Sequence, residues 1–273
     1  MTNVFATQGK HEFTRLTVTV ADGLAEVRLN RPEAGNTADW ATARDLLELS
    51  TLLAEDKSVR VVLLGANGRF FTAGGDINMF HGLAGPALPN SLRRMIDEYH
   101  LAIERLAALP VPIVAAVRGA AAGGGLGLVC VADIVVAADD ALFAFGATGI
   151  GLSADGGTSW YLPRIVGMRR AQEMMLLNRR LSALEALDWG LVTRVVPSDE
   201  LEVQARAIAE SLRSGATVAY GEIRRLLRDS MHSTLAEQLS AERDSIVRAA
   251  ATEDAAEGIA AFTERRRPNF GGR

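Results

Sequence analysis

Hydrophobic and polar positions alternate near the start of the chain and then recur at helical spacing. Residues 13–20 alternate and are rich in Thr and Val, and a second apolar stretch, Leu24–Leu29, follows Asp22-Gly23. An Asp-Gly pair between two such stretches is typical of a tight hairpin turn, so we expect two antiparallel strands. Residues 37–53 then place leucines at helical spacing and predict the first helix.

Short apolar runs alternate with helical patterns through the middle of the chain. Residues 59–64, which are apolar except for Arg60, and Ile113–Val117 are long enough for a buried strand and too short for a helix. A helix is expected over residues 91–109, another opens at the glycines of residues 123–131, and residues 133–137 predict a further strand. Strands alternating with helices predict an α/β fold with helices against mostly parallel strands.

The last quarter of the chain has an almost wholly helical pattern. Helices are expected at residues 200–212, 218–230, Leu235–Ala250 and 253–262. This set is too small for a good core of its own, so we expect it to pack on the main domain or on another subunit. We therefore divide the chain into a core, residues 1–196, and a C-terminal helical region, residues 197–273.

Composition narrows the class of function. The 273 residues are 48% hydrophobic, so a substantial core is expected, and a net charge of −4 gives no support to a nucleic-acid partner. No apolar run reaches ~18 residues, so no membrane span is expected. The first 13 residues show neither a signal-peptide nor a transit-peptide pattern, which favours the cytoplasm. Cys130, the only cysteine, lies in an apolar run and is predicted to be buried.

Two glycine-rich segments directly follow predicted strands. They read FFTAGGDI at residues 70–77 and GAAAGGG at residues 119–125. Open α/β sheets bind ligands at the carboxyl ends of their strands, and free N–H groups there can hold a developing oxyanion. Tight packing of helix on strand would explain each loop as well. A G-x-G-x-x-A match at residues 149–154 is a weak dinucleotide signal, and the four histidines (His11, His81, His100 and His232) lack metal-ligand spacing.

One carboxylate stands out in a neutral stretch. Between residues 141 and 163 the only formal charge is Asp155, within the sequence GLSADGG, and its neighbours are apolar, small or hydroxylic. Such a group either caps the helix expected to begin just after it or moves protons. The residues alone leave both interpretations open.

Several motifs in order resemble the enoyl-CoA hydratase/isomerase, or crotonase, superfamily. They are LNRPEAGN, GRFFTAGGDI, PIVAAVRGAAAGGGLGL, ADIVVAADDALFAFG, GLSADGGTSWYLPRIVG and LSALEALDWGLVTRVVP. The resemblance implies a ββα spiral core that binds an acyl-CoA thioester and needs no metal or redox cofactor. It also implies homotrimers, often paired into hexamers, with the C-terminal helices packed between subunits.

The same resemblance implies a set of site residues. The backbone N–H groups of Ala73 and Gly124 would form an oxyanion hole for the thioester oxygen. The loop lining the pantetheine and adenine region would consist of Ala73, Gly74, Gly75, Asp76 and Ile77.

The chain departs from the hydratase pattern at two positions. Gly127 and Ala147 stand where hydratases that resemble it carry glutamates. Adding water across a double bond needs a base and an acid, whereas shifting the double bond needs one base. Asp155 remains, and it resembles the aspartate of dienoyl-CoA and ring-1,2-epoxyphenylacetyl-CoA isomerases. The sequence therefore favours an isomerase with Asp155 as its single acid/base.

Two alternatives remain open. One is a hydratase with a different acid/base, for which Asp97, Glu98 and Glu104 are candidates. The other is an acyl-CoA binder without turnover. The acyl chain length cannot be derived from these motifs, although residues 79–94 are expected to shape the acyl pocket.

Overall fold

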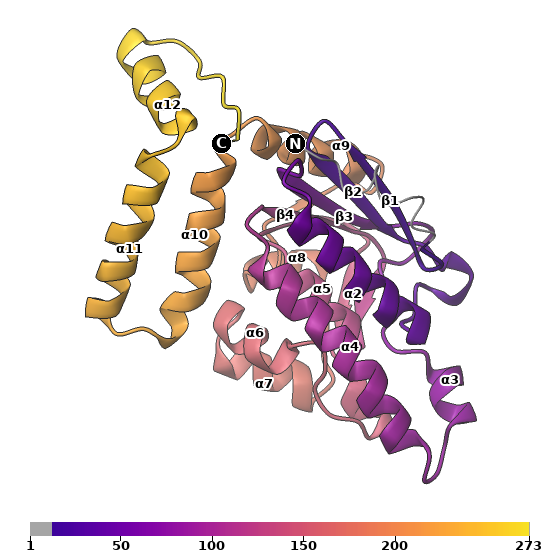
Figure 1. Cartoon of the computed structure of the whole chain (residues 1–273). Helices are drawn as coiled ribbons and strands as arrows, with labels where there is room; N and C mark the ends of the chain where they lie inside the picture. The colour runs from indigo at the N-terminus through magenta and orange to yellow at the C-terminus, as the bar shows by residue number, and fades with distance from the viewer. Residues whose placement is uncertain (1–12, 273) are drawn as a thin grey trace.

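The computed structural model describes residues 13–272, so His11 and the prediction for the N-terminal residues lie outside the described part. Within it, the main sheet has six strands in the order β1-β2-β3-β4-β6-β9 (Figure 1). The strands are β1 (Leu16–Ala21), β2 (Leu24–Leu29), β3 (Val61–Ala66), β4 (Ile113–Val117), β6 (Ile134–Ala138) and β9 (Arg194–Val196). Within this sheet of the described residues, only β1 and β2 pair antiparallel, which confirms the predicted hairpin and the mostly parallel sheet.

A second, three-stranded sheet has the order β5-β7-β8 in the described residues. Its strands are β5 (Ala120–Ala122), β7 (Leu142–Ala144) and β8 (Arg180–Ser182). The chain repeats a strand–strand–helix unit: β4 and β5 lead into α5 (Leu126–Cys130), and β6 and β7 lead toward α6 (Thr158–Ile165). Each unit gives one strand to each sheet, and the sequence did not predict this second sheet because three residues are too few to show alternation.

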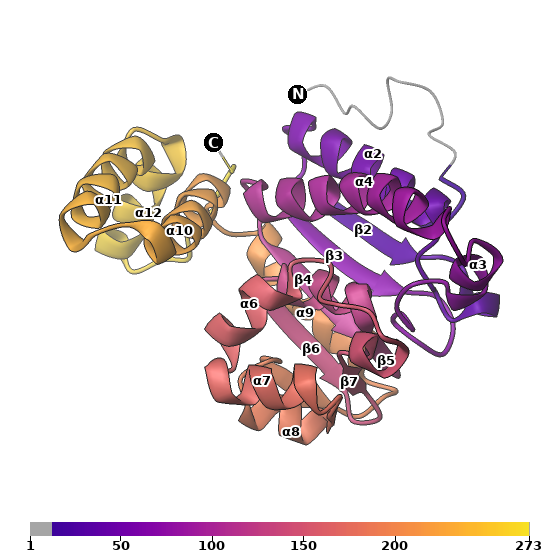
Figure 2. The same cartoon turned by 90° about the horizontal axis from the view of Figure 1, so that it is seen from below.

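Helices cover both faces of the main sheet. α2 (Trp40–Glu55) and α4 (Leu88–Ala108) pack against each other over one face (Figure 2), and α9 (Leu201–Arg213) packs on the other. Val62 and Leu64 of β3 belong to the core under α2, while Val61 and Leu63 belong to the core under α9. Because β3 is buried on both faces, its sequence is continuously apolar.

The glycine-opened helix is shorter than predicted. Gly123–Gly125 form a 3₁₀ turn, and α5 follows with five residues. Gly123 has φ of 57°, a left-handed conformation that cannot continue an α-helix. Three further short helices complete the core: α3 (Ile77–Gly82), α7 (Met168–Leu176) and α8 (Ala183–Asp188).

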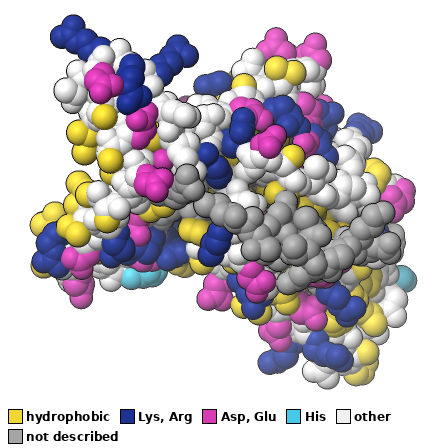
Figure 3. Space-filling view, turned by 45° about the horizontal axis from the view of Figure 1, so that its top comes forward, with side chains coloured by type: hydrophobic (Ala, Val, Ile, Leu, Met, Phe, Trp, Pro, Cys, Tyr) yellow, Lys and Arg dark blue, Asp and Glu magenta, His cyan; other side chains and the backbone are white. Residues whose placement is uncertain are grey.

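The last three helices project from the body of the molecule (Figure 1). They are α10 (Thr217–Asp229), α11 (Leu235–Ala250) and α12 (Glu253–Glu264). Figure 3 shows hydrophobic side chains on the surface of this projection, and the strongly exposed ones include Leu227, Leu235, Ile246 and Phe262. None of the described helices combines the length and the apolar composition needed to cross a bilayer.

Candidate active site

The two glycine-rich loops run side by side. The Thr72 N–H donates to the Ala120 carbonyl at 2.9 Å, and the Ala122 N–H donates to the Thr72 carbonyl at 3.0 Å. These bonds make a parallel bridge between Thr72 and Ala121, just beyond the carboxyl ends of β3 and β4. The sequence placed the loops at neighbouring strand ends, and the structure joins them there by backbone hydrogen bonds.

Glycine is what lets the loops touch beyond that bridge. Gly74 has φ of 99°, and a β-carbon on it would lie 3.3 Å from the Gly123 Cα. A β-carbon on Gly123 would lie 3.7 Å from the Gly75 nitrogen. Following the parallel register from the bridge brings Gly75 beside Gly124.

The prediction that the Ala73 N–H forms part of the oxyanion hole is wrong. Its N–H donates to the Gly35 carbonyl at 2.9 Å, so it is not free to bind a substrate oxygen. Ala73 does border the cavity described below, together with Gly124. The loop therefore needs a different donor.

Gly75 supplies that donor. The Ala38 N–H donates to Gly74 O at 2.8 Å, and the Asp76 N–H donates to Ala38 O at 3.0 Å. Because Ala38 bonds to the residues on either side of Gly75, the N–H of Gly75 itself points away from Ala38. Neither this N–H nor that of Gly124 has a hydrogen-bond acceptor within residues 13–272. Two unpaired N–H groups from neighbouring loops are what an oxyanion hole requires.

Tyr99 of α4 anchors the second donor. Its hydroxyl donates to the Gly124 carbonyl at 2.9 Å, and its side chain is buried. Burial, with the nearby charge of Asp155, raises the Tyr99 pKa, so the hydroxyl keeps its proton and acts as a donor. Tyr99 thereby holds the peptide group next to the candidate oxyanion hole.

Asp155 is not a side-chain helix cap. α6 begins at Thr158 with Gly157 as its N-cap residue, and no side chain caps it. The Asp155 backbone carbonyl accepts hydrogen bonds from the Thr158 N–H at 3.2 Å and its hydroxyl at 2.8 Å. The capping interpretation is therefore wrong for the carboxylate, which is left for other interactions.

The two oxygens of the Asp155 carboxylate have different surroundings. Oδ1 accepts the Gly156 N–H at 2.8 Å and lies 2.6 Å from His100 Nε2. Oδ2 lies on the cavity side, where a β-carbon on Gly124 would be 2.8 Å from it. The carboxylate is 31% exposed and the imidazole 49%. One oxygen is thus anchored while the other faces the candidate oxyanion hole.

Sequence reasoning missed His100. It lies on α4 next to the buried Tyr99, and it is 55 residues from Asp155 in sequence. Nothing in the local pattern marks it, because its partner is set by how α4 packs against the loop before α6. The hydratase candidates Asp97 and Glu98 do not border the cavity among the described residues, and Glu104 borders only a second cavity.

A cavity of about 350 Å³ lies beside Gly75, Gly124 and Asp155. It is bordered by Ala73, Gly74, Gly75, Ile77, Gly124 and Asp155, with an apolar wall from Phe80, Leu92, Met95, Ile96, Ile150 and Leu152. Ala147 contributes a methyl group to the lining. At Gly127 a β-carbon would lie 2.0 Å from the Gly156 carbonyl oxygen, so the present backbone has no room for any side chain there.

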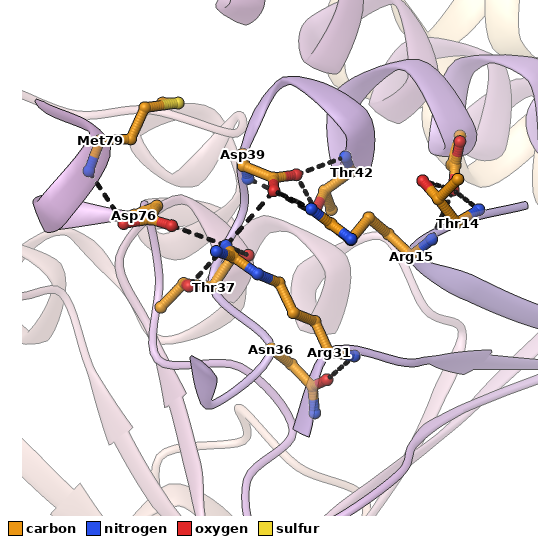
Figure 4. Close-up of polar contacts among 10 residues, drawn as sticks. Thr14, Arg15, Arg31, Asn36, Thr37, Asp39, Thr42, Asp76 and Met79 are labelled. Atoms are coloured by element: carbon orange, nitrogen blue, oxygen red, sulfur yellow. Dashed lines mark hydrogen bonds and ion pairs between the residues drawn. The ribbon is translucent and has the colours of Figure 1, made fainter. Parts of the chain in front are cut away.

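Asp76, predicted to contact substrate, does not border this cavity. Its carboxylate is buried, accepts the Met79 N–H at 3.0 Å as the N-cap of α3, and accepts Arg31 Nη1 at 2.6 Å (Figure 4). Burial raises its pKa, but these hydrogen bonds outweigh it and hold the pKa below its ordinary value. Asp76 therefore orients the loop that carries Gly74 and Gly75.

A metal-ligand cluster or the cysteine could supply another reactive group among the described residues. No group of three or more His, Cys, Asp or Glu side chains there is arranged to hold a metal ion. Cys130 is buried as predicted, and burial raises its pKa to about 12, which leaves it a poor nucleophile.

Comparison with known proteins decides the family. The family model described as enoyl-CoA hydratase/isomerase matches residues 19–273. The chain belongs to the enoyl-CoA hydratase/isomerase family. The chain is 37% identical to the 1,2-epoxyphenylacetyl-CoA isomerase of Escherichia coli K12, over 93% of this chain and 97% of that protein. It is 34% identical to 4-chlorobenzoyl coenzyme A dehalogenase-1 of an Arthrobacter species, over 90% of each.

Solved structures agree with the family's fold. The enoyl-CoA hydratase of Polaromonas sp. JS666 superposes with a TM-score of 0.88 at 32% identity, covering 93% of this chain and 98% of that one. The predicted crotonase-like α/β fold with C-terminal helices is confirmed. Enzymes of this hydratase/isomerase family act on acyl-CoA thioesters.

Proposed function

We propose that this protein is an acyl-CoA isomerase that moves a carbon–carbon double bond, with Asp155 as its single acid/base. The observation that carries the proposal is the Asp155 Oδ2 oxygen, which lies beside Gly124 on the cavity wall. The positions where hydratases that resemble the chain carry glutamates hold Gly127 and Ala147. A single available carboxylate suits proton transfer between two carbons better than addition of water.

Substrate binding follows from the two loops. The thioester carbonyl oxygen accepts the N–H groups of Gly75 and Gly124, and the loop from Ala73 to Ile77 contacts the pantetheine arm. Both donors are fixed before the substrate arrives, Gly75 by the pairing of its neighbours with Ala38 and Gly124 by Tyr99. Fixed donors stabilise the negative charge that develops on the oxygen without reorganising during the reaction.

Proton transfer then uses one oxygen of Asp155. Oδ2 takes a proton from a carbon conjugated to the thioester, and the electron pair of that C–H bond moves into the thioester to form an enolate. The same Oδ2 returns the proton to a different carbon, and the double bond has moved. No proton or electron is gained or lost overall, so the reaction requires no redox cofactor. The N–H groups of Gly75 and Gly124 stabilise the enolate charge in place of a Lewis-acid metal, so we expect chelators to leave turnover unchanged.

His100 has a positioning role in this scheme. Asp155 must be ionised to act as a base, and an ionised carboxylate only accepts, so this mechanism requires the tautomer of His100 with its proton on Nε2 in the 2.6 Å contact. Together with the Gly156 N–H it fixes Oδ1, which holds Oδ2 toward the substrate. Charge-assisted hydrogen bonds of this kind are stronger than neutral ones, so they restrict rotation of the carboxylate.

A second function is favoured by the same contact. A carboxylate can attack an activated carbon, expel a leaving group with its electron pair and form an ester, which a water molecule deprotonated by a neighbouring imidazole then hydrolyses. His100 lies where it could take that proton, and one relative is named as a 4-chlorobenzoyl coenzyme A dehalogenase. Chloride release from 4-chlorobenzoyl-CoA would identify this reaction.

A substrate panel tests the proposed function. The purified protein is incubated with 2-enoyl-, 3-enoyl- and 3,5-dienoyl-CoA thioesters. The products are separated by liquid chromatography, which resolves double-bond isomers of equal mass, and are then weighed by mass spectrometry. Isomerisation without a gain of 18 mass units (one water) is expected. Addition of water would instead identify a hydratase, and binding without any product would identify a non-catalytic acyl-CoA binder.

We also propose that the protein assembles through its C-terminal helices as a homotrimer or as a hexamer made of two such trimers. The support is the set of apolar side chains that α10, α11 and α12 expose, because contiguous apolar surface of this kind is typical of subunit interfaces. Light scattering should give three or six chain masses. A single chain mass at micromolar concentration would contradict the assembly.

A further inference from the structure

A second cavity, of about 580 Å³, adjoins the first. The two share Ala154 and Asp155 as lining residues. The remaining wall comes from α4, α6 and the end of the C-terminal helix α10: His100, Ile103, Glu104, Ala107, Trp160 and Arg228 are among its residues. We call it the outer cavity and the first one the inner cavity.

The wall of the outer cavity is built by specific contacts. The Trp160 and Tyr161 rings meet edge to face with centroids 4.7 Å apart, and the His232 ring lies 6.2 Å from the Trp160 ring. Arg228 donates to the Ala107 carbonyl at 3.3 Å and so ties α10 to α4 across the cavity. The C-terminal region thereby contributes one wall of the outer cavity, and the core contributes the others.

Asp155 stands at the junction of the two cavities. Its Oδ2 oxygen lies beside Gly124 in the inner cavity, and its Oδ1 oxygen meets His100, which borders only the outer cavity. Acyl carbons that react with Oδ2 therefore lie near the opening of the outer cavity. The inner cavity must hold the reacting carbons and the end of the pantetheine arm, so the atoms beyond the reacting carbons need another place.

We propose that the outer cavity receives the remote part of the acyl group, and that the substrate is an acyl-CoA whose acyl group extends past Asp155 to the Trp160 ring. This rests on the proposed function only in that the ligand is an acyl-CoA with its thioester at Gly75 and Gly124. The occupant is apolar where it meets Ile103, Ala107 and Trp160. A straight chain and a phenyl-terminated chain would both satisfy this chemistry.

Binding of saturated thioesters tests the proposal independently of turnover. Butanoyl-, decanoyl- and 6-phenylhexanoyl-CoA are titrated calorimetrically into the unaltered protein and into the variants Ala107→Leu and Trp160→Ala. Ala107→Leu partly fills the outer cavity, and Trp160→Ala removes the ring at its far wall. Leu177→Ala is the matched control, because Leu177 is 76% exposed and borders neither cavity.

The expected result is a length-dependent affinity that both variants reduce. Each buried methylene should tighten binding by up to ~4-fold, so decanoyl-CoA should bind at least ~10-fold more tightly than butanoyl-CoA to the unaltered protein and the control. In Ala107→Leu the ratio of the affinities for decanoyl-CoA and butanoyl-CoA should fall below ~3-fold, with the affinity for butanoyl-CoA unchanged. If 6-phenylhexanoyl-CoA binds more tightly than decanoyl-CoA, and this difference disappears in Trp160→Ala, the substrate carries a ring.

Two results would overturn the outer-cavity proposal: equal affinities for butanoyl- and decanoyl-CoA in the unaltered protein, or an undiminished ratio of these affinities in both variants. Because saturated thioesters cannot isomerise, these readings do not depend on Asp155 acting as a base. If only the substrate panel fails, the isomerase proposal is wrong and the outer-cavity proposal is unaffected.

Discussion

Two carboxylates border the inner cavity, and their surroundings differ. Asp39 Oδ2 accepts two hydrogen bonds from Arg15 at 2.8 and 2.9 Å and lies 3.4 Å from Arg31, while its Oδ1 accepts the Thr42 N–H as the cap of α2 (Figure 4). Asp155 has one side-chain partner among the described residues, His100, and its Oδ2 faces the cavity. The Asp39 carboxylate is therefore held by structural hydrogen bonds, whereas the Asp155 carboxylate has an oxygen available to a substrate.

The pKa of Asp39 follows from this. Burial raises it, but the hydrogen bonds from Arg15 and Thr42 outweigh burial and hold the pKa below its ordinary value. Asp39 therefore stays ionised at neutral pH and does not exchange protons with a substrate. A carboxylate that borders a binding cavity acts as a base only where its neighbours leave an oxygen unshared.

The sharpest way to break this comparison is to neutralise each carboxylate in turn. Asp155→Asn should lower kcat for isomerisation by ~10³-fold, because the only available base is gone. Asp39→Asn should keep kcat within a few-fold of the unaltered protein. Steady-state assays of both variants on the best substrate of the panel measure this, and equal losses in the two would show that the assignment of the base is wrong.

A smaller change tests the geometry around Oδ2. In Gly124→Ala the new methyl group would lie 2.8 Å from Oδ2, so the carboxylate must move away from the substrate. We expect kcat to fall by ~10²-fold, comparable with the loss of one oxyanion-hole donor. Gly82→Ala is the control, since a β-carbon there meets nothing within 4 Å. A fully active Gly124→Ala would place the reacting atoms elsewhere.

His100 should show an intermediate effect. His100→Ala removes the side-chain partner of Oδ1 and should lower kcat ~10-fold with a smaller change in KM, because the contact mainly orients the base. His100→Gln can still donate to Oδ1 and should recover most of the loss. His81→Ala serves as the histidine control. If Gln at position 100 is as impaired as Ala, hydrogen bonding to Oδ1 is not the role of this side chain.

The smallest effect is on stability and depends on pH. Asp39→Asn keeps a capping oxygen but loses the charge that pairs with Arg15, and should lower the free energy of unfolding by ~1 kcal/mol at pH 7. Because the folded pKa of Asp39 is depressed, its contribution is present above the unfolded pKa of ~3.9 and is lost as pH falls through the folded value. Urea denaturation at pH 7 and pH 3 should show the difference shrinking. A constant difference would mean that charge is not its cause.

Most of the fold could be predicted from periodicity. The hairpin of β1 and β2, the buried strands β3 and β4, and helices α2 and α4 all produce patterns longer than four residues. The three-residue strands β5, β7 and β8 produce none, because their pairing is decided by neighbours far away in sequence.

The site was predictable where one residue carried the signal. Asp155 is the lone charge in a neutral stretch, which marked it as a candidate, and the family resemblance favoured a role in proton transfer. The oxyanion donor was misplaced from Gly75 to Ala73. The sequence does not show that the Ala73 N–H donates to the Gly35 carbonyl, while the Gly75 N–H has no acceptor among the described residues. His100 was missed since its role exists only once α4 is packed.

The backbone around Gly127 bears on how this protein could be redesigned. The Gly156 carbonyl oxygen occupies the space where a side chain at position 127 would begin. Installing a glutamate there by a single substitution would collide with the main chain that carries Asp155, so a water-adding variant would require rebuilding that turn first. Such a conversion would have to pass through a protein that performs neither reaction well.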